Sequence, residues 1–101
     1  MLNIDVQKAD GVLRVTLDGR LTSASSKDLS QLMKSELDGV HRVEFDFANL
    51  DYISSAGLRI LIATQQHMEA IGGENVCVNN ASGVVLDTLE MTGFQGVINI
   101  V

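Results

Sequence analysis

The sequence predicts an α/β fold, in which a mixed β-sheet opens with an antiparallel hairpin and continues with helices alternating with mainly parallel strands (β-β-α-β-α-β-α-β). In two opening segments, apolar and polar residues alternate strictly, which is the period of a strand with one buried face. Segments with helical spacing then alternate with short apolar segments, which implies parallel strands joined by right-handed crossovers. A chain of 101 residues suits one domain, which we expect to span residues 1–101.

The opening hairpin is the first predicted element. Residues 2–7 and residues 13–17 carry Leu, Ile or Val at every second position. Between them, Asp10-Gly11 is a typical two-residue hairpin turn. We expect Gly19 to end the second strand, because glycine interrupts the alternating pattern there.

The first helix is predicted from Leu and Met residues at helical spacing between residues 29 and 37. Hydroxyl residues in the segment 22–26 are candidate N-caps. A cap near Ser25 would place Asp28 in the first turn, where the helix dipole favours an acid. Gly39 is the predicted stop.

The rest of the chain continues the alternation of strands and helices. We expect a strand over residues 43–47, a loop over residues 48–53 and a second helix from about Ser55 to Ile71. The later elements are a strand over 76–79, a helix over 81–91 and a last strand over 97–101. On the second helix, one apolar side at helical spacing comprises Leu58, Leu61, Ile62 and Met68.

Composition argues against several classes of function. The chain carries 7 basic and 13 acidic residues, a net charge of −6, which opposes binding to nucleic acid or to anionic lipid. No apolar run approaches the ~20 residues of a membrane span, and charges interrupt the N-terminal segment, so we expect a cytoplasmic protein without a signal peptide. His41, His67 and the single cysteine, Cys77, form no pattern typical of a metal site or of catalysis. We therefore expect no enzyme activity, no cofactor and no metal, and we interpret Cys77 as a buried apolar residue.

The segment 45–61, which leads from a strand into the second helix, is the most informative part of the chain. It places Ser54 and Ser55 at a helix N-terminus, where free N–H groups and a partial positive charge suit a phosphate. Gly57 in the first turn costs about 1 kcal/mol relative to alanine. Close approach by another backbone, such as that of a kinase or a partner, is one interpretation of this glycine. The plainer alternative for the serines is that Ser54 or Ser55 only caps the helix.

The pair Tyr52-Ile53, followed by Ser54-Ser55-Ala56-Gly57-Leu58, resembles the phosphorylation-site motif of STAS-domain anti-sigma factor antagonists. The resemblance covers the whole chain, and it includes the segments 19–21, 71–73 and 89–94 in the family's order. It implies a STAS fold in which Ser55 is the phosphoacceptor. Many members carry Asp where this chain has Ser54 or Thr22, so whether Ser54 is a second acceptor stays open.

The resemblance also implies partners. The unphosphorylated protein would bind an anti-sigma factor that is also a serine kinase of the histidine-kinase-like ATPase fold, and would thereby release a sigma factor. A metal-dependent serine phosphatase would reverse the modification, and ATP and the metal belong to these partners. The residues expected to contact a partner are Thr22, Ser23, Asp46, Ser54, Ala56, Gly57, Arg59, Ile60 and Ala63.

Two functions stay open at this point. The chain is either such a switch, or a constitutive STAS scaffold or ligand-sensing module whose serine is not modified, and the hydroxyl of Ser55 favours the switch. On the second helix, Ala56, Ile60 and Ala63 project toward a different side from the apolar side described above. They indicate either a broadly buried helix or a docking patch beside Ser55. We expect a monomer or a weak dimer.

Overall fold

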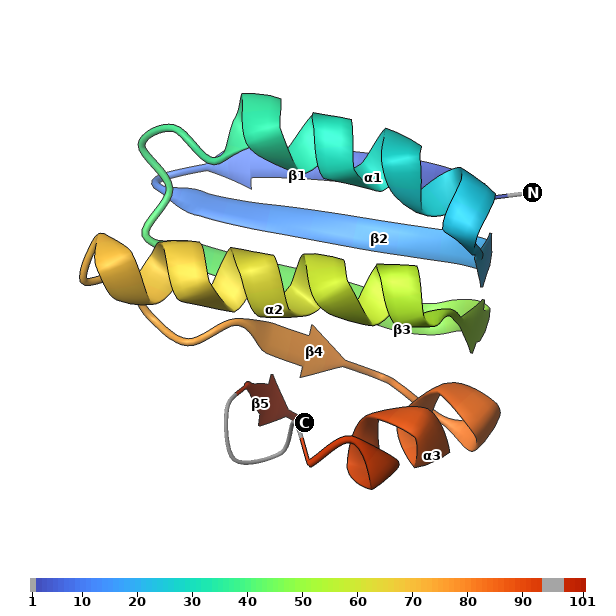
Figure 1. The fold of residues 1–101 in the computed structure, drawn as a ribbon. Helices are drawn as coiled ribbons and strands as arrows, with labels where there is room; N and C mark the ends of the chain where they lie inside the picture. The colour runs from blue at the N-terminus through green and yellow to red at the C-terminus, as the bar shows by residue number, and fades with distance from the viewer. Residues whose placement is uncertain (1, 94–97) are drawn as a thin grey trace.

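In the computed structural model, which describes residues 2–93 and 98–101, five strands and three helices form a sheet with helices packed against it (Figure 1). The sheet order is β1-β2-β3-β4-β5, and α1 and α2 lie side by side across one face. This confirms the predicted order of elements. Two residues named by the sequence analysis lie outside the described residues: Phe94 of the family-like segment 89–94, and Val97 of the predicted last strand. The elements are β1 (Leu2–Ala9), β2 (Val12–Leu21), α1 (Ser23–Glu36), β3 (Arg42–Ile53), α2 (Ser55–Ala70), β4 (Cys77–Asn79), α3 (Gly83–Met91) and β5 (Asn99–Ile100).

The opening hairpin forms as predicted, but its second strand is longer than expected. β1 pairs antiparallel with β2, and both turn residues, Asp10 and Gly11, have positive φ (55° and 78°). Such angles match the right-handed twist of the flanking strands. The prediction that Gly19 ends the strand is wrong, because β2 continues to Leu21, whose side chain is buried.

The remaining strand pairs are parallel, and β3 is the longest strand among the described residues. The predicted loop over residues 48–53 is wrong, since β3 continues to Ile53. Against β2, β3 carries one additional residue between Asp46 and Asn49 and another between Leu50 and Tyr52. Such bulges shift the inward-facing positions: after the first, Leu50 is buried out of step with Phe45 and Phe47, and after the second, the buried residue Ile53 is in step with them again.

The helix termini also refine the sequence analysis. Thr22 is the N-cap of α1, and it forms a capping box with Ser25: the Ser25 N–H donates to Thr22 Oγ1 (3.2 Å), and the Thr22 N–H donates to Ser25 Oγ (2.8 Å). Asp28 therefore lies in the second turn of α1, and the prediction of an acid in the first turn is wrong. The helix ends at Glu36, three residues before Gly39.

The core lies between the sheet and the inner faces of the helices. Leu61 and Met68 of α2 are buried, whereas Ile62, on the same apolar side in the sequence pattern, is 37% exposed. The inward face of α2 instead includes Gln65, which is 1% exposed. Its amide satisfies two groups near β4: Nε2 donates to Asn75 Oδ1 (2.8 Å), and Oε1 accepts from the Val76 N–H (2.7 Å). A buried polar side chain of this kind is tolerated because both ends of its amide are paired.

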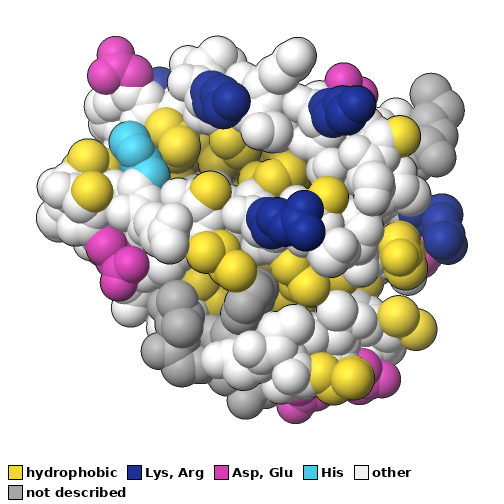
Figure 2. Space-filling model, viewed as in Figure 1, with side chains coloured by type: hydrophobic (Ala, Val, Ile, Leu, Met, Phe, Trp, Pro, Cys, Tyr) yellow, Lys and Arg dark blue, Asp and Glu magenta, His cyan; other side chains and the backbone are white. Residues whose placement is uncertain are grey.

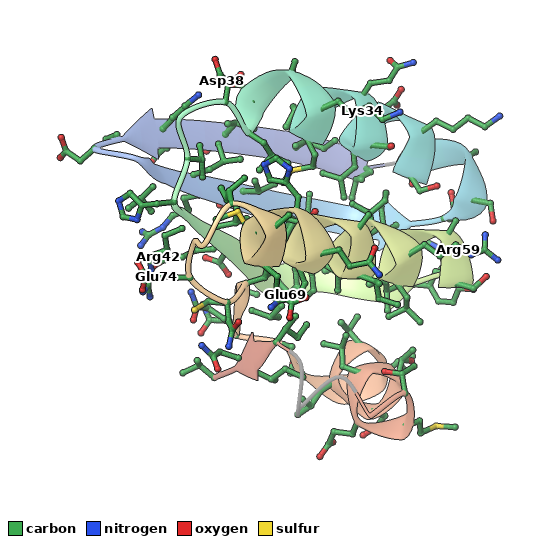
Figure 3. All side chains as sticks on the ribbon, turned by 60° about the vertical axis from the view of Figure 1, so that its left-hand side comes forward. Lys34, Asp38, Arg42, Arg59, Glu69 and Glu74 are labelled. Carbon is green, nitrogen blue, oxygen red and sulfur yellow. The ribbon has the colours of Figure 1, made fainter. Side chains whose placement is uncertain are left out.

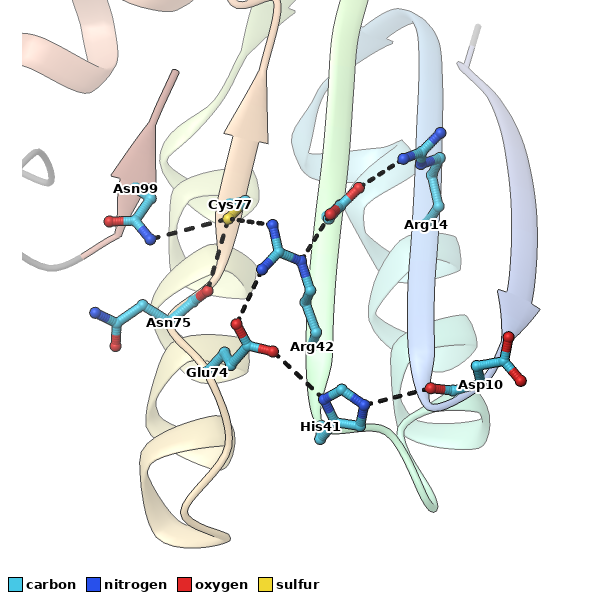
Figure 4. A network of polar contacts seen from close by, with 9 residues as sticks. Asp10, Arg14, His41, Arg42, Glu74, Asn75, Cys77 and Asn99 are labelled. Carbon is cyan, nitrogen blue, oxygen red and sulfur yellow. Dashed lines mark hydrogen bonds and ion pairs between the residues drawn. The ribbon is translucent and has the colours of Figure 1, made fainter.

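A polar network links the amino ends of the parallel strands (Figure 4). Glu44 on β3 accepts from Arg14 Nη2 (2.8 Å) and from Arg42 Nε (2.7 Å), and Arg42 also pairs with Glu74 (2.9 Å). The hydrogen bonds from Arg14 and Arg42 hold the pKa of the Glu44 carboxyl below its ordinary value of 4.5. Cys77 is buried as predicted, although Arg42 Nη2 lies 3.7 Å from its Sγ.

We expect Glu44→Gln to lower the free energy of unfolding by about 1–2 kcal/mol at neutral pH, because two arginines lose a charged acceptor whose side chain is only 13% exposed. A carboxyl with a lowered pKa stabilises the fold above its unfolded-state pKa, and this contribution is lost as the pH falls through its folded-state pKa. The difference between variant and parent should therefore shrink on acidification below 4.5. Urea unfolding as a function of pH measures it.

Glu69→Gln is the matched control, since it removes the same charge from an exposed position on α2. Its effect should stay within about 0.5 kcal/mol at every pH. A Glu44→Gln difference that is independent of pH would show that the ion pairs are not its cause.

Candidate functional site

The candidate site lies where β2 and β3 end together at one edge of the sheet. Leu21 pairs with Ile53 at the ends of the two strands, and the Ser54 N–H donates to the Leu21 carbonyl oxygen (2.8 Å). Immediately afterwards α1 and α2 begin, so their N-termini lie at the same edge, at the right of Figure 1. The hydroxyl residues at the N-termini of the two helices therefore lie at the same edge of the sheet.

Ser54 caps α2 and is buried. It is the N-cap in extended conformation, and its Oγ accepts from the Gly57 N–H (3.2 Å). Its exposed fraction is 8%. The alternative that one of the two serines only caps the helix therefore applies to Ser54.

Ser55 is the first residue of α2, and it is exposed. Within residues 2–93 and 98–101, no hydrogen bond of its hydroxyl is recorded. The first N–H groups of a helix have no partner within the helix, and Ser54 Oγ satisfies only that of Gly57. Ser55 thus presents an unengaged hydroxyl at a positive helix end, which is chemically suited to carry a phosphoryl group.

Gly57 is buried, and the packing around it within this chain explains why a glycine is needed at this position. A Cβ at this position would lie 2.7 Å from Leu21 Cδ2 and 3.0 Å from Ile53 Cγ1. The first turn of α2 therefore packs directly on the ends of β2 and β3. The interpretation that the glycine leaves room for a visiting backbone is wrong, because the neighbours are core side chains of this chain.

The N-terminus of α1 repeats the arrangement of α2. Thr22 is half-buried and engaged in the capping box, and Ser23 is the exposed first helical residue, in the position that Ser55 has in α2. Beside this edge, Arg20 lies over the ring of Tyr52, with 4.6 Å from the guanidinium carbon to the ring centroid. The sequence analysis did not single out this cation–π pair.

Asp46 lies within β3, not at its end. Its Oδ1 accepts from the Ala48 N–H (3.0 Å) and from Asn80 Nδ2 (3.1 Å). Because β3 continues to Ile53, Asp46 is separated from Ser55 by the remaining length of that strand. Asp46, one of the residues expected to contact a partner, is therefore not at the end of β3 where α2 begins.

Four of the expected contact residues line one groove between α1 and α2, of about 390 Å³. Figure 2 shows this face, where apolar side chains lie in the hollow and Lys and Arg side chains lie around it. Figure 3 places Lys34 on α1 and Arg59 on α2. The sequence analysis named only the α2 wall, because it treated each helix alone. The lining residues are Ala56, Arg59, Ile60, Ala63 and Thr64 of α2, and Ser26, Lys27, Ser30, Met33, Lys34 and Leu37 from α1 and the residue after it.

Two further features bear on the class of function. In the described part of the chain, no group of three or more His, Cys, Asp or Glu side chains is arranged to hold a metal ion. No helix of the described residues is long and apolar enough to cross a membrane.

Comparison with known proteins identifies the family. The model of the STAS domain family matches residues 3–101. A protein of Bordetella bronchiseptica that carries the name anti-sigma factor antagonist BtrV is 32% identical over 97 residues, which are 95% of this chain and 83% of that protein. The chain belongs to the STAS-domain family of anti-sigma factor antagonists.

Solved structures show the same fold. An anti-sigma factor antagonist from Mycobacterium paratuberculosis matches with a TM-score of 0.86 at 21% identity, over 99% of this chain and 85% of that one. SpoIIAA in its unphosphorylated form matches with a TM-score of 0.79 at 15% identity, over 98% and 87%. The phosphorylated form of SpoIIAA from Bacillus matches with 0.78 at 14%, over 98% and 91%. These matches confirm the predicted STAS fold.

The two serines should differ sharply in their effect on stability. We expect Ser54→Ala to lower the free energy of unfolding by about 1 kcal/mol, because it removes the cap on Gly57. Ser55→Ala should change it by less than about 0.5 kcal/mol, since that hydroxyl is exposed. Denaturant unfolding of both variants measures the difference, and equal effects would contradict the assigned roles.

Gly57→Ala tests the close packing beneath Ser55. In a helix with free space, alanine would stabilise by about 1 kcal/mol relative to glycine. Here we expect a loss of about 1–3 kcal/mol, because the new methyl group would press on Leu21 and Ile53. Thermal unfolding gives the sign directly. Combining Gly57→Ala with Leu21→Val, which shortens the nearest side chain, should cost less than the sum of the two single losses.

Proposed function

We propose that this chain is a phosphorylation-controlled antagonist, whose unphosphorylated form binds an anti-sigma factor that is also its serine kinase. One observation carries the proposal: the Ser55 hydroxyl is exposed at the N-terminus of α2, while Ser54 supplies the cap. The chain itself needs no catalytic group in this function. The family includes SpoIIAA, which is described in both unphosphorylated and phosphorylated forms, and this supports a comparable modification here.

The proposed reaction is a phosphoryl transfer from ATP bound by the kinase. Ser55 Oγ attacks the γ-phosphorus, the bond to the bridging oxygen of ADP breaks, and the hydroxyl proton passes to a base of the kinase. The product carries about −1.5 to −2 charge at neutral pH. A serine phosphatase would return the hydroxyl by hydrolysis.

The fold should tolerate this group, because the positive end of α2 faces it. An interface that covers Ser55 would not, since the phosphate must be desolvated there. A hundredfold change in affinity needs only about 2.7 kcal/mol of difference between bound and free states. One poorly paired charge at an interface supplies this amount.

Incubation with ATP and the cognate kinase should add about 80 Da, the mass of one phosphoryl group. Intact-mass measurement detects the gain, which Ser55→Ala should abolish and Ser23→Ala should leave unchanged. Ser23 is the matched control, because it is also exposed at the first position of a helix on the same edge. A gain that survives Ser55→Ala, or no gain at all, would instead support a constitutive module.

A further inference from the structure

The distribution of positive charge in this acidic chain is uneven. Of its 7 basic residues, four are engaged within the fold. Lys8 donates to the carbonyl oxygens of Glu36 and Asp38, Arg14 and Arg42 pair with carboxylates, and Arg20 lies over Tyr52. The other three have no recorded ion pair or hydrogen bond among the described residues; they are Lys27, Lys34 and Arg59.

All three of these unengaged cations line the groove between α1 and α2. The described lining contains no Asp or Glu, although the chain has 13 such residues. In a chain with a net charge of −6, the groove is therefore a local positive field on an acidic molecule. Such a field favours an acidic occupant, and it would repel a basic one.

The floor of the groove is apolar. Met33, Leu37 and Ile60 supply aliphatic surface, and two of the three uncharged polar residues of the lining are already hydrogen-bonded within their own helices. Ser26 Oγ donates to the Ser23 carbonyl oxygen (2.8 Å), and Thr64 Oγ1 donates to the Ile60 carbonyl oxygen (2.8 Å). An apolar surface of an occupant would be buried on this floor, and few polar groups of the floor need a hydrogen bond from that occupant.

The shape of the groove selects between an elongated and a compact occupant. Its lining spans Ser26 to Leu37 on one wall and Ala56 to Thr64 on the other, which are lengths of about 16 and 12 Å at 1.5 Å per helical residue. The cations stand on both walls, and Lys27 and Lys34 are about two turns apart. A site for a single anionic headgroup would have its cations gathered at one end. The three cations of this groove are instead spread along both walls, which matches an occupant with carboxylates along two of its sides.

We infer that this groove docks an acidic amphipathic helix of the partner protein, whose apolar ridge lies on Met33 and Ile60 while its flanking carboxylates meet the three free cations. About two to three turns of helix fit its length. The inference rests on the proposed function for the identity of the partner, and it adds the chemistry of the element that docks.

A synthetic peptide tests the inference on the intact chain. The probe is an alanine-rich peptide of about 16 residues, with leucines at i, i+4, i+7 and i+11 and glutamates on both flanks. Titrated into ¹⁵N-labelled protein, it should shift the amide signals of Met33, Ile60 and Ala63 saturably. The same peptide with lysine in place of glutamate should not.

Matched double variants separate the groove from overall charge. Lys34→Gln/Arg59→Gln should weaken peptide binding roughly tenfold. Gln31→Glu/Gln66→Glu, at exposed positions on the same two helices outside the groove lining, should change it less than about twofold. Both doubles move the net charge from −6 to −8, because two positive charges are lost or two negative charges are added.

Three results would overturn the inference: no saturable shift by the acidic peptide, equal weakening in both doubles, or groove shifts caused by dodecanoate but not by the peptide. The last would assign the groove to a small anionic amphiphile. Ser55→Ala should bind the peptide as the parent does. Failure of phosphorylation at Ser55 would therefore leave this test intact, and failure of peptide binding would not bear on phosphorylation.

Discussion

The contact on which the site depends is the close packing of the first turn of α2 against the ends of β2 and β3. Gly57 lies on Leu21 and Ile53, and the Ser54 N–H is bonded to the Leu21 carbonyl oxygen (2.8 Å). These contacts hold the strand ends and the helix start as one rigid corner. Because residue 54 faces inward in this corner and residue 55 faces outward, a one-residue change in register would exchange their roles.

The different roles of Ser54 and Ser55 follow from the geometry of this corner between the strand ends and α2. A helix N-cap must place its hydroxyl over the backbone N–H groups, which makes it a poor substrate for another protein. The next residue has helical backbone angles, and its side chain is not needed for capping. A switch built on adjacent hydroxyls therefore gains a modifiable group without losing the cap. The capping pair Thr22 and Ser25 on α1 frees the exposed Ser23 in a similar way.

The order of elements could be predicted from the sequence because burial periodicity is local, but details that depend on neighbouring strands could not. The bulges of β3 arise from its register with β2, and the alternation that ends at Phe47 therefore led to the prediction of a loop over residues 48–53. The sequence indicates that Gly57 is unfavourable in a helix. The reason that a glycine is needed there is its packing on Leu21, which is far away in the sequence. The α1 wall of the groove was missed for the same reason. The sequence signal that could have revealed this wall is the pair Lys27 and Lys34, which are seven residues apart and therefore lie on one side of a helix.

The proposed phosphorylation and the inferred docking groove are coupled by helix geometry. Ser55 and Arg59 are four residues apart on α2, so their side chains are neighbours on its surface. A phosphoryl group on Ser55 would bring its charge to the end of the groove where Arg59 stands, and would pair with that cation in cis. It would thereby remove one of three unengaged positive charges and repel the carboxylates of an acidic helix. Release of the partner then follows from lost attraction as well as from desolvation, with no change in the fold of the chain.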